Sequence, residues 1–148
     1  MLKTFFAALF VCATSVFAAP IEVSDAYARE VPPNLKNSAA FMKIANTTTE
    51  ELFLLGAASP VATRVELHEH VMEGEMMKMR PVEKIAIAPH AHTTLEPGGL
   101  HVMLIGLNAP MREGETIVLE LYFSNGQKQT LDAVPIKSVM MGMKKHKM

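Results

Sequence analysis

Apolar and polar residues alternate over short runs along most of this chain, and Gly, Pro and Asn separate the runs. A period of two places successive side chains on opposite faces of a β-strand. The clearest run is 116–124, whose apolar face consists of Ile117, Leu119, Leu121 and Phe123. The Asn125-Gly126 pair that follows is a strong signal for a two-residue hairpin. Residues 127–136 are therefore expected to form the last strand.

The same pattern predicts strands along the rest of the chain, where helical periodicity is weak. The expected strands are 21–28, 38–45, 51–57, 61–70, 76–82, 84–88, 93–95, 100–107, 116–124 and 127–136. Many short strands separated by turn residues are typical of an antiparallel Greek-key sandwich or barrel. We therefore expect an all-β protein with a single domain.

Residues 1–18 have the features of a cleaved signal peptide. Lys3 supplies a short positive segment, an apolar run follows, and Val16-Phe17-Ala18 fits the small-residue rule for cleavage. The only cysteine, Cys12, lies inside this run in a context that fits a lipoprotein signal poorly, so we expect it to be discarded. The run is too short for a membrane span. The mature chain is thus expected to be exported and to have no membrane span.

Charge and composition narrow the function classes. The chain has 14 Lys and Arg against 15 Asp and Glu, and loss of Lys3 leaves a formal charge of −2. There is no basic surface of the kind that nucleic-acid binding requires. The sequence has no Ser-His-Asp order, nucleotide motif or paired-carboxylate signal, so an enzyme is not expected. With no cysteine in the mature chain, a metal site in an oxidising compartment gains by using imidazole and thioether ligands.

Histidine and methionine are concentrated between residues 68 and 103. Three pairs lie two positions apart on predicted strands, so each pair shares a face. The pairs are His68 and His70, Met77 and Met79, and His101 and Met103. Imidazole and thioether form a soft, neutral ligand set that suits Cu(I), whereas blue-copper electron transfer is excluded because it needs a Cys thiolate. The turn at Pro97-Gly98-Gly99 precedes His101 and predicts a site at a rim of the sandwich.

The spacing of four of these residues resembles a known signature. Ten residues separate His68 from Met79, and twenty-one separate Met79 from His101-x-Met103. This spacing is similar to that of the periplasmic copper chaperones called PCu(A)C. The resemblance covers 21–136, and the flanking segments that carry it are 58–61, 65–69, 77–82 and 97–104.

The resemblance implies a cupredoxin-like β-domain, 19–137, that holds one Cu(I) through His68, Met79, His101 and Met103. It also implies delivery of copper in the periplasm towards the Cu(A) centre of cytochrome c oxidase, directly or alongside a Sco-type protein. Some members of the family have a Met- and His-rich C-terminal extension that binds further copper, including Cu(II). The tail 138–148 resembles a short version, with candidate ligands Met140, Met141, Met143, His146 and Met148.

The chain departs from the family pattern at His70, where methionine is common. An imidazole there can compete for the metal or raise the affinity for Cu(II), so His70 is a further candidate ligand. Met72 and Met76 are expected to be surface or packing residues, and the loop residues His90 and His92 are expected to be solvated.

Three alternatives to a copper carrier follow from the same residues. A copper-buffering or resistance protein would use the same ligands without a dedicated acceptor. A copper oxidase or monooxygenase would need a substrate pocket and an open metal position. A structural β-sandwich would carry its Met and His residues incidentally. The copper carrier, acting as a monomer and passing the ion to an acceptor protein, is the expectation that best fits the spacing.

Overall fold

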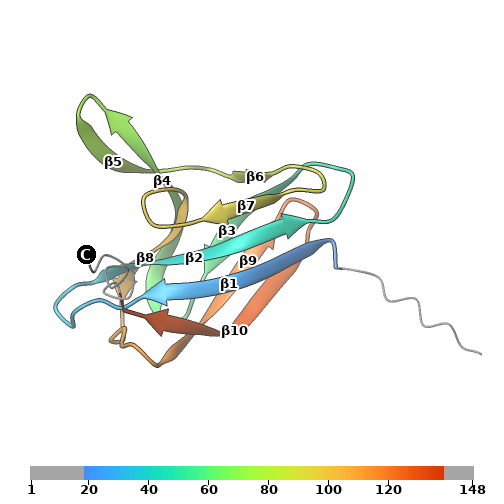
Figure 1. The fold of residues 1–148 in the computed structure, drawn as a ribbon. Coiled ribbons are helices and arrows are strands. Elements are labelled where there is room, and N and C mark those ends of the chain that lie inside the picture. Colours follow the sequence, from blue (N-terminus) through green and yellow to red (C-terminus); the bar gives the residue numbers. More distant parts are fainter. Residues whose placement is uncertain (1–18, 139–148) are drawn as a thin grey trace, which may run out of the picture.

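The computed structural model describes residues 19–138, which form an all-β sandwich (Figure 1). The strands are β1 (Ile21–Arg29), β2 (Asn37–Asn46), β3 (Leu52–Ala58), β4 (Ala62–Glu73), β5 (Met76–Pro81), β6 (Ile85–Ile87), β7 (His92–Leu95), β8 (His101–Leu107), β9 (Thr116–Phe123) and β10 (Lys128–Lys137). Within 19–138 no helix is long and apolar enough to span a membrane. The predicted signal peptide, and the predicted tail after residue 138, lie outside the described residues.

One continuous order of strand pairing runs through the molecule. The order is β5-β4-β8-β2-β1-β10-β9-β3-β6, and β7 pairs with β2 farther along the edge that β8 uses. Every pair is antiparallel except β1 with β10, which meet in parallel at Ala28–Ile136 and Arg29–Lys137. That junction joins two layers, and Figure 1 shows β1 and β2 in front of β3 and β9.

Both layers contribute apolar side chains to one core. The apolar face that alternation predicts for β9 is buried, and the Asn125-Gly126 hairpin to β10 forms as expected. The opposite layer supplies alternate residues of β2 and β8, namely Ala40, Met42, Ile44, Val102 and Leu104. All ten strands lie within three residues of their predicted bounds. The expected all-β fold is therefore confirmed.

The candidate ligands on β8 face away from this core. Because Val102 and Leu104 point inward, the period of two places His101 and Met103 on the outer face of the layer. The turn that precedes β8 folds back over this face, where Pro97 and Gly98 line the same cavity as His101. The candidate ligands therefore lie on the outer face of the layer, and His101 is the first residue of β8. The position of a metal site at a rim of the sandwich stays a prediction.

β4 and β5 form a hairpin that extends beyond the sandwich (Figure 1). β4 runs to Glu73, three residues farther than predicted, and turns at Gly74, whose φ is +67°. β5 is an edge strand, and all six of its residues are exposed. His68 therefore lies in the middle of β4, where the strand passes from β8 onto the hairpin.

Candidate metal centre

Two histidines face each other across adjacent strands at the centre of the site. His68 of β4 and His101 of β8 are register partners, and their ring centroids are 5.7 Å apart. His70, the next residue on the same face of β4, places its ring centroid 5.1 Å from that of His101. The strand register thus brings three imidazoles from two segments together on the outer face.

In each ring of the central pair, one nitrogen is hydrogen-bonded and the other nitrogen has no partner in the described structure. His101 Nδ1 donates to the Gly99 carbonyl at 3.0 Å, and His68 Nε2 donates to Glu66 Oε2 at 2.8 Å. His101 Nε2 and His68 Nδ1 are buried and find no partner among residues 19–138. Buried polar atoms normally have a partner, so two orphaned ring nitrogens in neighbouring rings need an explanation.

This arrangement is the one that metal-binding histidines usually have. A ligating imidazole donates its second N–H to a carboxylate or backbone carbonyl, which fixes the tautomer and orients the ring. Here Glu66 and Gly99 provide those two acceptors. The nitrogens left over carry lone pairs and are shielded from water, so they are ready to bind a Lewis acid.

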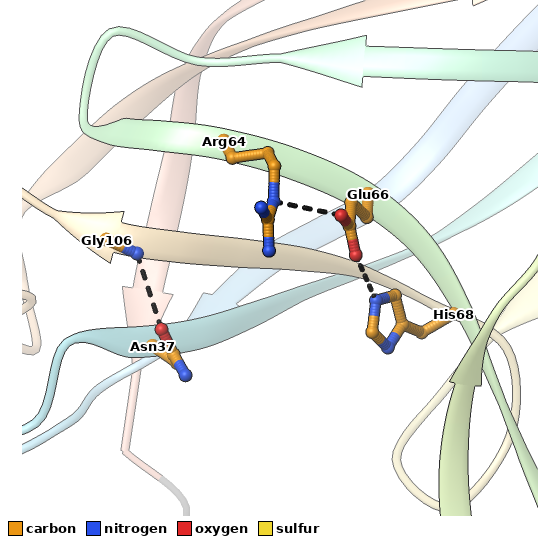
Figure 2. Close-up of polar contacts among 5 residues, drawn as sticks. All are labelled: Asn37, Arg64, Glu66, His68 and Gly106. Atoms are coloured by element: carbon orange, nitrogen blue, oxygen red, sulfur yellow. Dashed lines mark hydrogen bonds and ion pairs between the residues drawn. The ribbon is translucent and has the colours of Figure 1, made fainter.

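Glu66 is itself held by a cation on the same strand. Arg64 Nε lies 2.9 Å from Glu66 Oε1, so the carboxylate bridges Arg64 and His68 (Figure 2). The three residues alternate along β4 and therefore share its outer face. Hydrogen bonding by His68 is the main cause that lowers the pKa of Glu66, and the charge of Arg64 adds to it.

A hydrogen bond links β2 to β8 near the site. The Gly106 N–H donates to Asn37 Oδ1 at 3.3 Å (Figure 2).

Burial keeps His101 in the form that a metal needs. The residue is 2% exposed, and desolvation is the main cause that lowers its pKa. The Gly99 carbonyl opposes this effect, while His70, His68 and Arg29 reinforce it. The imidazole is therefore neutral at neutral pH, which is the protonation state that a metal ligand requires.

A cavity of about 400 Å³ lies beside these rings. Three of the four predicted ligands line it, namely Met79, His101 and Met103, and His70 joins them. His68 packs against His101 but turns its ring towards Glu66. The strand register explains why these side chains lie close together. Met79 pairs with His70 on the hairpin, and Met103 pairs with Glu66 across β4 and β8.

Four features of the site were not anticipated from the sequence. They are Glu66, the Gly99 carbonyl, Phe41 and Arg29. The Phe41 ring lies 6.3 Å from that of His101, and the Arg29 guanidinium stacks over Phe41 at 5.6 Å. The period-two alternation along β4 could have placed Glu66 beside His68, because Glu66 is two residues before it and shares its face. Nothing in the local sequence connects β1 or β2 to the site.

Other sequence candidates lie elsewhere. His92 begins β7 and pairs with Ala45, and both His90 and His92 are exposed, as expected of solvated residues. Between residues 19 and 138, no three His, Cys, Asp or Glu side chains are grouped so that they could hold a metal ion, and this includes the three imidazoles of the candidate centre. The tail candidates Met140, Met141, Met143, His146 and Met148 lie outside the described residues.

Comparison with known proteins identifies the family. The family described as "Putative lipoprotein LpqE-like" matches residues 21–136. The putative lipoprotein Lxx21020 of Leifsonia xyli subsp. xyli (strain CTCB07) is 34% identical over 118 residues, which cover 79% of this chain and 69% of that protein.

Solved structures give the same result. The Cu(I) form of DR1885 from Deinococcus radiodurans is 34% identical with a TM-score of 0.61, covering 84% of this chain and 83% of that one. The copper-bound PCuAC domain from PmoF2 is 21% identical with a TM-score of 0.66, covering 81% and 96%, and it supports the cupredoxin-like fold. Because the family match spans almost the whole described domain, the chain belongs to the LpqE-like family, which is the PCu(A)C family.

Proposed function

We propose that this protein is a copper chaperone that binds one Cu(I) ion through His68, Met79, His101 and Met103. The observation that carries the proposal is the pair of buried ring nitrogens, His68 Nδ1 and His101 Nε2, in adjacent rings whose other nitrogens are already bonded. A similar protein, DR1885, has been solved with Cu(I).

The donor set selects the oxidation state. Two neutral imidazoles and two thioethers are soft ligands, and they favour Cu(I) over Zn(II) or Mg(II). Thioethers have no proton to lose, and burial keeps His101 neutral, so these three ligands release no proton when they bind copper near neutral pH. The bound ion would keep its single positive charge, which weakens its retention relative to a thiolate site.

Exposure of the ligands suggests the route of transfer. His101 is 2% exposed, whereas Met79 is 51% exposed on the edge hairpin. A ligand from an acceptor can therefore replace the Met79 sulfur first, and the buried imidazole would leave last. This order allows stepwise exchange without free copper, and it requires no catalytic turnover.

The proposal extends to location and acceptor. Residues 1–18 would direct export to the periplasm, where the copper would pass towards the Cu(A) subunit of cytochrome c oxidase, directly or through a Sco-type protein. His70 lines the same cavity and would be a secondary ligand. A second Cu(II) ion in the tail remains a prediction from the sequence.

A Cu(I) competition titration against a chromogenic chelator tests the ligand set. The mature chain should bind tightly, and His101→Ala or Met103→Leu should weaken binding by at least about tenfold, or about 1.4 kcal/mol. His92→Ala is the matched control, because His92 is an exposed histidine on β7. Equal affinity in all variants would refute the assignment of these ligands.

Gene deletion separates delivery from buffering. Loss of oxidase activity under copper limitation would support a chaperone. Sensitivity to excess copper with normal oxidase activity would support the buffering alternative.

A further inference from the structure

The β4–β5 hairpin has two faces of different chemistry. Its register is unbroken from His68↔Pro81 to Glu73↔Met76. Every charged side chain of these paired segments lies on one face, where Glu69 pairs with Arg80 at 2.7 Å and Glu73 with Lys78 at 2.9 Å. The opposite face continues outward from the candidate centre and carries His70, Met72, Met77 and Met79.

The methionines on the uncharged face are exposed to an unusual degree. Met72 is 63% exposed, Met77 58% and Met79 51%. β5 is an edge strand on which every residue is exposed, so none of its side chains is buried against another part of the described structure. An apolar edge strand invites unwanted association, and soluble proteins usually place charge there. The charge here is confined to the other face, so solubility does not explain the methionine face.

We propose that Met72, Met77 and Met79 form an accessory Cu(I) site, through which the ion enters and leaves the centre at His68, His101 and Met103. This inference rests on the proposed function. Met72 and Met77 are register partners, which places their Cβ atoms roughly 5 Å apart. Met79 is the next residue on that face, about 7 Å along β5.

Ligand chemistry fits this placement. Methionine side chains are unbranched and flexible, so three thioethers at these spacings can converge on one soft ion. Met79 belongs to both sites and lines the cavity with His101. Transfer between them is a ligand exchange in which one sulfur leaves as a buried nitrogen or sulfur binds. Copper stays Cu(I), and no electron or proton moves.

Titration of the mature chain with Ag(I), a redox-inert soft ion, locates the sites when methionine methyl groups are observed by NMR. The first equivalent should shift Met103, and the second should shift Met72 and Met77. Met76 is the matched control, because it is 65% exposed on the same hairpin but pairs with Glu73 on the charged face. Residue-specific assignment separates these signals from those of the tail methionines.

Leucine variants test the path. Met72→Leu/Met77→Leu keeps the face apolar but removes both sulfurs, so it should slow Cu(I) release to a chelator by about tenfold. Its first-site affinity should stay at the value of the Met76→Leu control. Wild-type release rates in the double variant, or equal Ag(I) shifts at Met72, Met77 and Met76, would overturn the accessory site and indicate an apolar docking face instead.

The outcomes also separate this inference from the function on which it rests. If Ag(I) shifts Met72 and Met77 but never reaches Met103, the proposed centre is wrong and so is the path into it. If Met103 responds and the hairpin methyls do not, the proposed centre stands and only the accessory site fails.

Discussion

At the scale of single residues, the candidate centre depends on groups that orient the histidines as much as on the histidines. The Glu66 carboxylate accepts an N–H from His68, and the Gly99 carbonyl accepts one from His101 and also lies 3.3 Å from His70 Nδ1. The other nitrogens of His68 and His101 remain buried and unbonded. Without these acceptors either tautomer of each ring would be available, and the nitrogen that carries the lone pair would not be fixed. The orientation of His68 and His101 therefore follows from residues that never touch the metal in our proposal.

Replacement of Glu66 tests this orientation. Glu66→Gln keeps the side-chain shape but removes the charge that fixes the His68 Nε2–H, so Cu(I) affinity should fall by about tenfold to a hundredfold. Nitrogen chemical shifts of the metal-free protein should show a mixture of His68 tautomers.

Glu69→Gln is the control for this change. It breaks the ion pair between Glu69 of β4 and Arg80 of β5, which lies on the opposite face from Glu66. A single His68 tautomer and unchanged affinity in Glu66→Gln would contradict the positioning role.

At the scale of elements, the position of β8 between β4 and β2 brings the site together. β8 presents His101 to β4 and Met103 to Ala39 of β2, while its alternate residues enter the core. Near its end, Gly106 adopts a φ of +70° and accepts a hydrogen bond from Thr63 Oγ1 at 3.0 Å. The irregular backbone at Gly106 is thus packed directly against β4.

Substitution of Gly106 should destabilise this junction. A Cβ atom there would lie 3.0 Å from Thr63 Oγ1, and the left-handed backbone adds strain of about 1–2 kcal/mol for an L-residue. Gly106→Ala should lower the free energy of unfolding by about that amount in urea denaturation.

Gly56→Ala is the control, because no atom lies within 4 Å of its added Cβ and no positive φ is required. Equal stability of Gly106→Ala and the parent would show that β8 and β4 adjust freely.

At the scale of the whole molecule, burial of His101 couples folding to pH. The pKa of this histidine is lowered from 6.5 in the folded protein, chiefly by desolvation. Below pH 6.5 the unfolded chain takes up a proton that the folded chain resists. Stability is therefore full above that pH and decreases as the pH falls towards the lowered value.

Urea denaturation of the metal-free protein at about pH 7.5 and about pH 5.5 measures this coupling. The free energy of unfolding should fall more in the parent than in His101→Gln. His92→Ala, which removes an exposed histidine, should behave like the parent. The pKa of Glu66 is lowered from 4.5, so its contribution appears only at lower pH. An identical decrease in His101→Gln would place the coupling elsewhere.

The sequence determined the strands and much of the candidate ligand set. Period-two alternation, Asn125-Gly126 and the turn glycines are local signals, so the ten strands could be located to within three residues. The faces of His68, His101 and Met103 followed from the same period, and the spacing of the four candidate ligands pointed to the family that the comparisons confirm.

Only the tertiary structure decided which strands are neighbours and what covers them. Register between β4 and β8 set His68 opposite His101, and the turn before β8 brought Pro97 and Gly98 to the cavity that His101 lines. Phe41 and Arg29 reached the site from β2 and β1 because those strands follow β8 in the sheet. These relations depend on pairing between segments far apart in the chain, and hydrophobic alternation within a segment contains no information about its partner.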